Sequence, residues 1–387
     1  MKHHAGKAVA PEKKLKIAEV VPNMFCGGVR PFVVNLCNEL CLDHEVTLFV
    51  IMPSAGGRGF LTELSPEVKV VMLERDCSTF LRALCAIPAV CRAIRRLKPD
   101  VVHCHLEAFR AVIPLMIANF RRIPFLYTVH NDPGYDARRY VRLHRFLFRL
   151  PHVYPVIIYP DAASKFFRLF HCKAHLIVNG NNGQLPLPEE VERARREFSQ
   201  WKTTPRSLVV LNLARVSKQK NQVVLAKAVK SLADKGTDID LVIMGPEDPG
   251  GVIAGQIREL HCPRVHLVGM RTNALPYLAL ADALVLPSLY EGMPIAILEA
   301  FFLGIPCCVS ARGGMKDMIR HGDNGLVCTE TDLSGVEEML REFCALPADV
   351  REKMGRRARE SFAGYSMKEC AQNYLRLMRD AQGAFDR

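Results

Sequence analysis

The sequence is poor in aromatic residues and has no apolar segment of membrane-spanning length. Tryptophan occurs once in 387 residues, and aromatic residues make up 7% of the chain. The longest apolar runs, 111–120 and 279–287, are too short for a helix that crosses the ~30 Å hydrocarbon core of a bilayer. Residues 1–16 include basic residues but no apolar region before a cleavage site. We therefore expect no secretory signal and interpret 1–14 as a flexible leader.

The cysteines are not spaced as metal-binding or redox pairs. None of the fourteen belongs to a C-x-x-C pair, and several fall within apolar segments, as do Cys37, Cys41, Cys307 and Cys308. In a long chain without an expected secretory signal, this distribution favours reduced thiols in a hydrophobic core. We therefore expect a cytoplasmic protein.

The net charge of +12 is concentrated in the first half of the chain. Residues 1–182 hold 25 Lys and Arg against 14 Asp and Glu, whereas residues 183–387 hold 27 against 26. The densest basic stretches lie at 92–98 and 138–149, the second at helical spacing. A solvated helix face fits this pattern, and so does attraction to an anionic surface, either acidic lipid or polyphosphate.

Strand-like apolar runs alternate with helical patterns along the chain. This alternation predicts an α/β fold of two Rossmann-like, doubly wound domains, each with its ligand edge at the carboxyl ends of parallel strands. The Asn-, Gly- and Pro-rich stretch 179–188 is the expected linker, which gives domains at 15–184 and 185–365 and a last helix at 366–387. The expected strands are 15–21, 46–51, 68–73, 100–105, 124–130, 153–159 and 174–180, then 207–214, 239–245, 264–269, 283–288, 305–310 and 326–328.

Small and polar residues follow the expected strands of the first domain. Gly27 and Gly28 precede a helix, where backbone amides could approach an anion, although a tight turn without a ligand fits equally well. His103 and His105 share one face of a strand, but the spacing suggests no third ligand, so we expect no metal site. His105 and His130 stand at strand ends, and we expect both to hydrogen-bond a polar substrate between the domains, with His130 the stronger candidate.

A cationic loop follows the first strand of the second domain. Arg215 and Lys220 lie in the loop 215–221, directly before an amphipathic helix. Guanidinium and ammonium groups beside a helix N-terminus suit a phosphate, although a solvated loop is the alternative.

The segment SLYEGMPIAILEA, at 288–300, carries two glutamates in an apolar context. We expect Pro294 in the first turn of a helix, with the amides near Gly292 and Met293 facing the same crevice as the cationic loop. A buried Glu299 needs polar partners, which the hydroxyls of a ribose would supply. Glu291 would meet the group on the other side of the phosphate, and a partly exposed face or a salt bridge is the alternative for Glu299.

Together these segments resemble the GT-B glycosyltransferases of family 4. YEGMPIAILEA is similar to the family's motif of two glutamates separated by seven residues, and FFLGIPCCVSARGGMKDMIRHGDNGLV resembles its usual continuation. LNLARVSKQKN resembles the donor-phosphate loop, LVIMGPE and VHLVGM the segments around the base, and FCGGVRPFVVNL, PDVVHCH and TVH follow in the family's order. Lys316 and Asp317 depart from the pattern, where the family often has a Glu. The resemblance implies two Rossmann-like domains that face each other across a cleft.

The resemblance also implies a role for each site residue. Arg215 and Lys220 would bind the donor diphosphate, Glu299 the ribose and Glu291 the donor sugar. The expected catalytic groups are His130, Arg215, Lys220 and Glu291, and the expected acceptor side is Gly28, His105 and His130. The expected donor site comprises Gly27, Gly28, Arg215, Lys220, Gly245, Met270, Arg271, Glu291, Gly292, Met293, Pro294 and Glu299.

The activity implied by the resemblance is a retaining transfer that needs neither metal nor cofactor. The sugar would move from a nucleotide-sugar donor, a UDP-sugar first and GDP-mannose next, to a glycan or lipid-linked acceptor of bacterial polysaccharide synthesis. A front-face, oxocarbenium-like mechanism and closure of the domains would accompany it. As a hypothesis, the basic first domain docks peripherally on the anionic inner face of the cytoplasmic membrane. By family analogy, the last helix crosses back to the first domain.

Two alternative functions remain. A sugar-nucleotide epimerase of the same fold would act on the donor without an acceptor. A nucleic-acid or polyanion binder would explain the basic first half. However, it calls for aromatic stacking platforms, and aromatic residues are few while the motif-bearing half is nearly neutral. We therefore expect no nucleic-acid partner.

Overall fold

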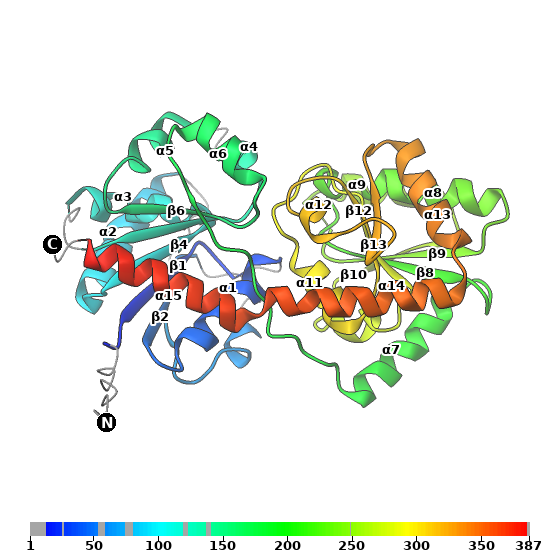
Figure 1. Ribbon diagram of the computed structural model, residues 1–387, viewed down its shortest axis with the longest axis horizontal. Helices are drawn as coiled ribbons and strands as arrows, with labels where there is room; N and C mark the ends of the chain where they lie inside the picture. Colours follow the sequence, from blue (N-terminus) through cyan, green and yellow to red (C-terminus); the bar gives the residue numbers. More distant parts are fainter. Residues whose placement is uncertain are drawn as a thin grey trace, which may run out of the picture.

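Two parallel β-sheets covered by helices form the two lobes of the molecule (Figure 1). The computed structural model describes residues 13–24, 27–52, 59–73, 80–118, 123–136, 141–247 and 249–384. Most of the expected leader, together with Arg138 and Arg139 of the basic stretch, lies outside the described residues.

The N-terminal lobe is built on a seven-stranded parallel sheet with the order β3-β2-β1-β4-β5-β6-β7. The chain order reverses between β1 and β4, so the switch point at which doubly wound folds bind ligands lies beside the ends of these two strands. The strands are β1 (Lys16–Val21), β2 (Glu45–Val50), β3 (Lys69–Met72), β4 (Val101–His105), β5 (Phe125–Val129), β6 (Val153–Ile157) and β7 (His175–Leu176).

The C-terminal lobe repeats this plan with a six-stranded parallel sheet of order β10-β9-β8-β11-β12-β13. Its switch point lies between β8 and β11. The strands are β8 (Leu208–Leu213), β9 (Ile239–Met244), β10 (Val265–Gly269), β11 (Ala283–Leu286), β12 (Cys307–Ser310) and β13 (Gly325–Cys328).

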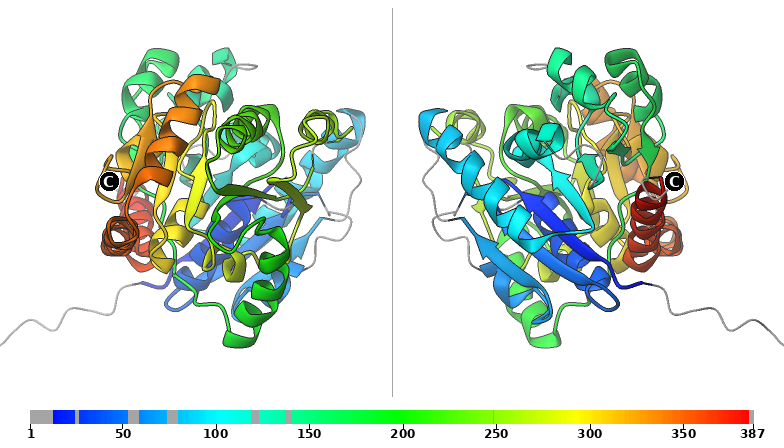
Figure 2. Two further views of the ribbon diagram at one scale, coloured as in Figure 1. Left: turned by 90° about the vertical axis from the view of Figure 1, so that its right-hand side faces the viewer. Right: turned by 90° about the vertical axis from the view of Figure 1, so that its left-hand side faces the viewer.

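Helices lie on both sides of the strands, as the views along the long axis show (Figure 2). In the N-terminal lobe they are α1 (Val29–Leu40), α2 (Phe80–Leu97), α3 (Phe109–Ala118), α4 (Pro133–Asp136), α5 (Val141–Leu147) and α6 (Ala162–Phe170). In the C-terminal lobe they are α7 (Pro188–Trp201), α8 (Gln222–Asp234), α9 (Val252–Arg258), α10 (Leu275–Leu278), α11 (Ile295–Leu303), α12 (Met315–Met318), α13 (Leu333–Ala345) and α14 (Ala348–Ser361). The short 3₁₀ helices are η1 (Gly59–Thr62), η2 (Leu106–Ala108), η3 (Lys218–Lys220) and η4 (Phe362–Tyr365), and α15 (Met367–Gly383) is the last helix.

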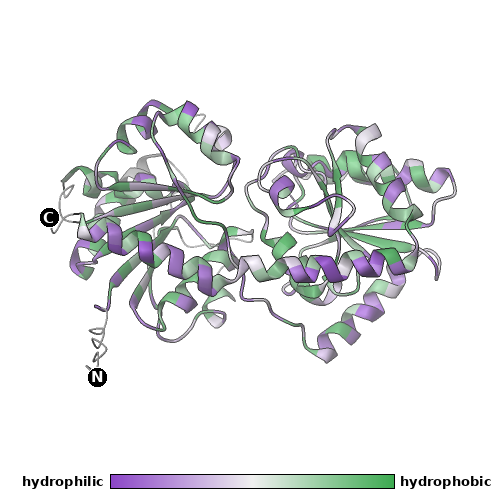
Figure 3. Cartoon of the chain, viewed as in Figure 1, coloured by the Kyte–Doolittle hydropathy of each residue, from purple (hydrophilic) through white to green (hydrophobic). Residues whose placement is uncertain are grey.

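The strands of both sheets contain many apolar residues (Figure 3). Every residue of β4, β5 and β9 is buried, as expected for parallel strands that helices cover on each side. The larger apolar cluster continues from the N-terminal sheet into α11, which explains why α11 is apolar on nearly all sides. The described cysteines are free thiols, most of them buried. Among the described residues, no helix combines the length and apolar character needed to span a bilayer.

The strand predicted at 174–180 is much shorter in the structure, so its predicted length is wrong. Only His175 and Leu176 pair with β6, and both are exposed. This strand is the edge of the sheet, so it gains little from burial, and the Asn- and Gly-rich sequence that follows leaves the ladder. The predicted linker begins where the pairing stops.

The chain returns to the N-terminal lobe at its end. After α14 on the C-terminal lobe, α15 runs along the N-terminal lobe and packs on α1 (Figure 1). The Asn181 amide donates to the Tyr365 carbonyl at 2.9 Å, and the Gln382 side chain donates to the Asp100 carbonyl at 3.1 Å. The last helix and the linker therefore hold the two lobes together.

Candidate functional site

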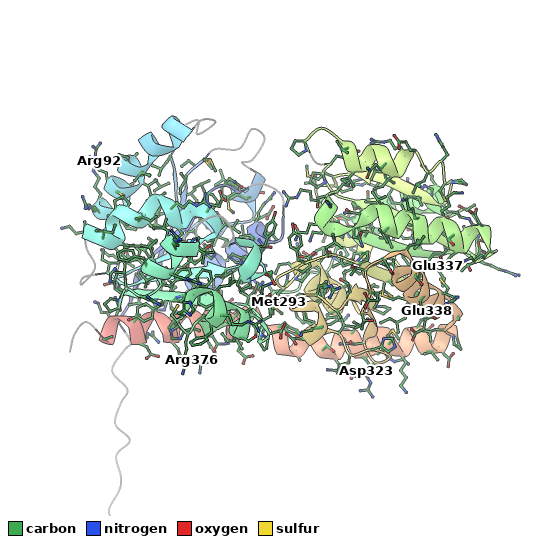
Figure 4. The ribbon with its side chains drawn as sticks, turned by 90° about the horizontal axis from the view of Figure 1, so that it is seen from above. Arg92, Met293, Asp323, Glu337, Glu338 and Arg376 are labelled. Carbon is green, nitrogen blue, oxygen red and sulfur yellow. The ribbon has the colours of Figure 1, made fainter. Side chains whose placement is uncertain are left out.

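The loop before α11 lies where the two lobes meet. Met293 lies at their boundary in Figure 4, and its carbonyl accepts a hydrogen bond from Asn179 Nδ2 at 3.3 Å. A Cβ atom on Gly292 would stand 2.0 Å from the His130 carbonyl oxygen, so only glycine allows β5 to end so close to this loop. A Cβ on Gly28 would stand 3.7 Å from Ile295 at the start of α11. Gly28 and the neighbouring Gly27 thus border the same junction as His130.

Pro294 is the residue that precedes α11 rather than a member of its first turn. Its backbone is extended, which suits the residue at this position. The helix thus begins at Ile295, two residues after Met293.

The loop 214–221 is held by side chains from its own lobe. Gln222 donates to the Asn212 side chain at 3.2 Å and to the Arg215 carbonyl at 3.0 Å. Gln219 donates to the Tyr290 carbonyl at 3.0 Å, which ties this loop to the loop before α11. The expected phosphate loop and the segment that carries Glu291 are therefore one connected structure.

Some hydrogen-bond donors of this loop have no partner among the described residues. Lys220 Nζ forms an ion pair with Glu291, and their side chains are 17% and 6% exposed. Arg215 is exposed and pairs with no acid of the described residues. The buried Ser217 hydroxyl has no hydrogen-bond partner among them, which is rare for such a group. A free guanidinium and an unused hydroxyl beside an ammonium provide donors for an anion.

Glu299 lines a cavity at the boundary of the lobes. The cavity has a volume of about 350 Å³ and is bordered by α1, η1, the linker and α11. Within the described part of the chain, no residue donates a hydrogen bond to the half-buried Glu299 carboxylate. Burial raises its pKa to about 7. The salt bridge considered for Glu299 is therefore absent from the described residues, and the carboxylate is available to a ligand.

The cavity contains groups that could accompany such a ligand. Its further lining residues are Pro31, Val34, Asn35, Thr62, Glu63, Asn181, Asn182, Gly183, Gln184, Leu275 and Phe302. Most of them come from segments that the sequence analysis did not connect with a site.

The residues expected around the base differ in their exposure. Met270 is 54% exposed. The Arg271 side chain donates to Glu197 at 2.9 Å and to the Val268 carbonyl at 2.7 Å, so it braces α7 instead of reaching outward. Gly245 follows β9 and lies against Ala214. Any contact of Arg271 with a base would therefore involve its backbone.

A buried hydrogen-bond network lies behind His130. Glu19 is the register partner of His103 on the neighbouring strand, and its carboxylate contacts His103 Nδ1 at 3.1 Å and His105 Nε2 at 2.7 Å. His105 Nδ1 contacts His130 Nε2 at 2.9 Å. Glu19 and His105 are fully buried. The direct acceptor contact predicted for His105 is therefore wrong, because both nitrogens of its ring contact other protein side chains.

The network continues from His103 to the last helix. His103 Nε2 contacts Thr128 Oγ1 at 2.8 Å, and Thr128 Oγ1 contacts the Tyr374 hydroxyl at 2.9 Å. Tyr374 belongs to α15 and is fully buried. Residues from β1, β4, β5 and α15 thus share one set of hydrogen bonds.

Glu19 is a third side chain of a type that can bind a metal, and the sequence analysis did not find it beside His103 and His105. One ligand atom from each of the three residues lies within 4.8 Å of the other two. Their mutual contacts have hydrogen-bond distances, and the remaining ring nitrogens are taken by Thr128 and His130. The network is thus satisfied by its own hydrogen bonds.

Family models match both halves of the chain. The model described as "Glycosyl transferases group 1" matches residues 194–361, and the model described as "Glycosyl transferase 4-like domain" matches residues 27–155. The chain belongs to the group 1 glycosyltransferases. It has the GT-B fold of this family, with a Rossmann-like domain in each lobe.

Individual group 1 relatives are distant. The chain is 22% identical over 386 residues to an alpha-1,4-N-acetyl-D-galactosaminyltransferase of Campylobacter jejuni named for a PP-undecaprenol-linked glycan, with 96% of this chain and 100% of the relative covered. It is 32% identical to N-acetyl-alpha-D-glucosaminyl L-malate synthase of Bacillus anthracis, but over only 34% of this chain and 35% of that relative. The structure of Anabaena HepE with UDP and glucose is similar, with a TM-score of 0.75, 17% identity and coverage of 94% and 99%.

The matched segments do not contain every member of the site. Glu19 precedes the first matched segment, and Tyr374 follows the second. The sequence analysis missed both residues. An acidic residue among the apolar residues of IAEVV, at 17–21, was the available signal for Glu19, whereas Tyr374 occupies an ordinary core position of an amphipathic helix.

Proposed function

We propose that this glycosyltransferase moves a sugar, with retention of configuration, from a UDP-sugar to a glycan or lipid-linked acceptor of bacterial polysaccharide synthesis. The observation that carries the donor part is Glu299, whose carboxylate lines a cavity between the lobes and receives no hydrogen bond from the described residues. Two ribose hydroxyls would supply the hydrogen bonds that this carboxylate lacks. The HepE structure contains UDP, which favours UDP over GDP as the nucleotide.

The diphosphate would lie between the loop 214–221 and the start of α11. Among the described residues, the Arg215 guanidinium and the Ser217 hydroxyl have no acceptor in this loop, and the N-terminus of α11 would add backbone amides. These groups would stabilise the charge that develops on the leaving diphosphate, so we propose a reaction without a metal or another cofactor.

When the donor binds, Lys220 and Glu291 would leave their ion pair and bind different parts of the donor. In the described structure, the ammonium and the carboxylate satisfy each other. A diphosphate would attract Lys220, and the sugar hydroxyls would then become the partners of Glu291. The ion pair thus keeps two buried charges compensated until the donor replaces it.

Binding of a nucleotide panel tests the donor assignment. Thermal shift and calorimetry with UDP, GDP, ADP and their sugars should give the strongest binding with UDP compounds. Glu299→Ala should lose roughly 1.5–3 kcal/mol of nucleotide affinity, the range for hydrogen bonds to a charged group. Unchanged nucleotide binding in this variant would contradict the ribose assignment, and NMR of the product anomer decides between retention and inversion.

The basic N-terminal lobe suits an acceptor held at an anionic membrane. Arg92, Arg95, Arg96 and Lys98 are exposed and line a hollow of about 740 Å³ on α2, together with Ile87 and other apolar residues. Figure 4 places Arg92 at the outer end of this lobe. Cations around an apolar hollow provide contacts for lipid phosphates and acyl chains. The C. jejuni relative is named for a PP-undecaprenol-linked substrate, which agrees with a lipid-linked acceptor.

Vesicle co-sedimentation tests this membrane contact. Anionic vesicles should bind the protein at low salt, and Arg92→Glu with Arg95→Glu should weaken binding at least tenfold, since each basic residue contributes about 1 kcal/mol. Arg193→Glu with Arg196→Glu makes the same change of charge on exposed positions of α7 in the other lobe and serves as the matched control. Equal binding to neutral and anionic vesicles would rule the contact out.

A further inference from the structure

His130 is held from behind by a chain of buried side chains. Its Nε2 contacts His105 Nδ1, and His105 Nε2 contacts the Glu19 carboxylate, at 2.9 and 2.7 Å. The His130 carbonyl meets the loop before α11 at Gly292, so the chain ends where the lobes join. His130 is 6% exposed, whereas the two residues behind it have no exposed surface. Of these three residues, His130 is therefore the one that lies at the junction.

The charge of Glu19 sets the direction of the hydrogen bonds. Burial alone would raise the Glu19 pKa, but electrostatic interaction and hydrogen bonding with His103 and the hydrogen bond of His105 lower it to about 2. An ionised carboxylate only accepts hydrogen bonds. Both histidines must therefore donate to it, His103 through Nδ1–H and His105 through Nε2–H.

The tautomer of His130 follows from that of His105. Burial, and then electrostatic interaction with His103, lower the pKa of His105 to about 4, so its ring is neutral near pH 7 and a proton on Nε2 leaves Nδ1 bare. His130 must then donate from its own Nε2–H to His105 Nδ1. Burial and His105 lower the His130 pKa well below its usual range, so its ring is also neutral. Its Nδ1 remains as a hydrogen-bond acceptor without a partner among the described residues.

The opposite direction would place two lone pairs against each other. If His105 carried its proton on Nδ1, its bare Nε2 would face the Glu19 carboxylate at 2.7 Å. That arrangement loses a charge-assisted hydrogen bond between two fully buried side chains. The geometry therefore selects one tautomer of His130 over the other.

We propose that Glu19 and His105 are positioning residues, which fix the ring and tautomer of His130 so that its Nδ1 accepts a hydrogen bond from a hydroxyl of the transferred sugar or of the acceptor. This inference rests on the proposed function, in which His130 borders the reacting centre. It assigns a task to Glu19, a residue that neither family segment contains. It also accounts for a carboxylate in the buried part of β1, whose other residues there are apolar.

NMR of protein labelled with ¹⁵N-histidine measures the tautomer directly and needs no substrate. The His130 signals are assigned by their loss in His130→Asn. Wild type should show Nε2–H at His130 near neutral pH. Glu19→Met removes both acceptor oxygens at similar side-chain volume, and His105→Gln breaks the link at its middle. Each variant should shift His130 towards Nδ1–H or a mixture of tautomers, and the second serves if the first does not fold.

Tyr374→Phe is the matched control for the loss of a buried hydrogen bond. It removes a bond of the same network, but on the far side of Glu19 from His130. This variant should retain Nε2–H at His130. A merely structural role of the network would instead give the same His130 signals in the Glu19, His105 and Tyr374 variants.

Steady-state kinetics with the UDP-sugar identified in the panel completes the test. Glu19→Met and His105→Gln should lower kcat at least about tenfold and change the donor KM less than about threefold, because the lost contact forms with the reacting groups. Nδ1–H or imidazolium at His130 in wild type, unchanged kcat in both variants, or one tightly bound metal ion per chain would overturn the proposal. A tautomer shift in a protein that binds no nucleotide sugar would refute the proposed function and support the positioning of His130.

Discussion

The charge of Glu299 makes donor binding depend on pH. Burial raises its pKa to about 7, so about half of the carboxyls are ionised at pH 7 and about a tenth at pH 6. Ribose hydroxyls would bind the ionised form. Donor affinity of the wild type should therefore fall about fivefold from pH 7 to pH 6, and about tenfold, or about 1.4 kcal/mol, for each further pH unit. Glu299→Gln removes the titrating group at nearly constant volume and should abolish this slope.

Calorimetry in two buffers with different ionisation enthalpies measures the protons released on binding. UDP-glucose is a suitable probe because its diphosphate does not titrate near neutral pH. At pH 7, the wild type should release about half a proton per donor bound, and Glu299→Gln none. Glu352→Gln, at an exposed site on α14, is the matched control and should release as much as wild type. Equal proton release from the Glu299 variant and the wild type would refute the reasoning.

The same pKa predicts how stability without a ligand depends on pH. The folded protein holds the Glu299 pKa above its ordinary value of 4.5, at about 7, so folding favours the protonated form. The stabilisation is complete below pH 4.5 and is lost as the pH rises through about 7. Glu299→Gln should therefore gain up to about 3 kcal/mol relative to wild type between these limits, measured by urea unfolding. A constant difference across this range would contradict the assigned pKa.

Two further variants test the junction around Glu291. Lys220→Met leaves the Glu291 carboxylate buried without its partner and should destabilise the protein by roughly 3 kcal/mol in urea unfolding, a loss that Glu291→Gln in the same chain should largely restore. If the losses of the two single variants simply added in the double variant, the ion pair would contribute nothing to the free energy of unfolding. Gly292→Ala places a Cβ atom 2.0 Å from the His130 carbonyl and should abolish transfer while circular dichroism stays unchanged. Gly255→Ala, in α9 with open space around the added Cβ, is its control and should stabilise the protein by up to about 1 kcal/mol.

The fold could be predicted from the sequence because its strands are buried on both faces. Such strands give continuous apolar runs, and these runs located the two sheets within a few residues. The exception was 174–180, where the edge strand pairs only at His175 and Leu176. An edge strand has one neighbour and little burial, so the apolar pattern says little about where its pairing ends.

The candidate site could be predicted only where its residues are close in sequence. Glu291 and Glu299 lie eight residues apart on one loop and helix, and the cationic loop is equally local. The contact of Lys220 with Glu291 joins positions separated by 71 residues, and that of Thr128 with Tyr374 joins positions separated by 246. Neither contact leaves a local pattern, because each depends on how strands are ordered in a sheet and on where the last helix returns.

Glu19 and Glu299 show that the number of hydrogen-bond donors, more than burial, determines whether a carboxylate is ionised in the folded protein. Burial acts on Glu19 and Glu299 in the same direction, since it raises the pKa of both. Glu19 receives hydrogen bonds from two histidines, which more than offset burial and hold the carboxylate ionised. Glu299 receives no hydrogen bond from the described residues, so a ligand would have to supply the donors for its carboxylate. A residue with satisfied charge can orient a neighbour, and one without partners gains most from binding. Glu19 lies in a strand and Glu299 on α11 at the boundary of the lobes, so the proposed positioning and binding roles belong to different elements.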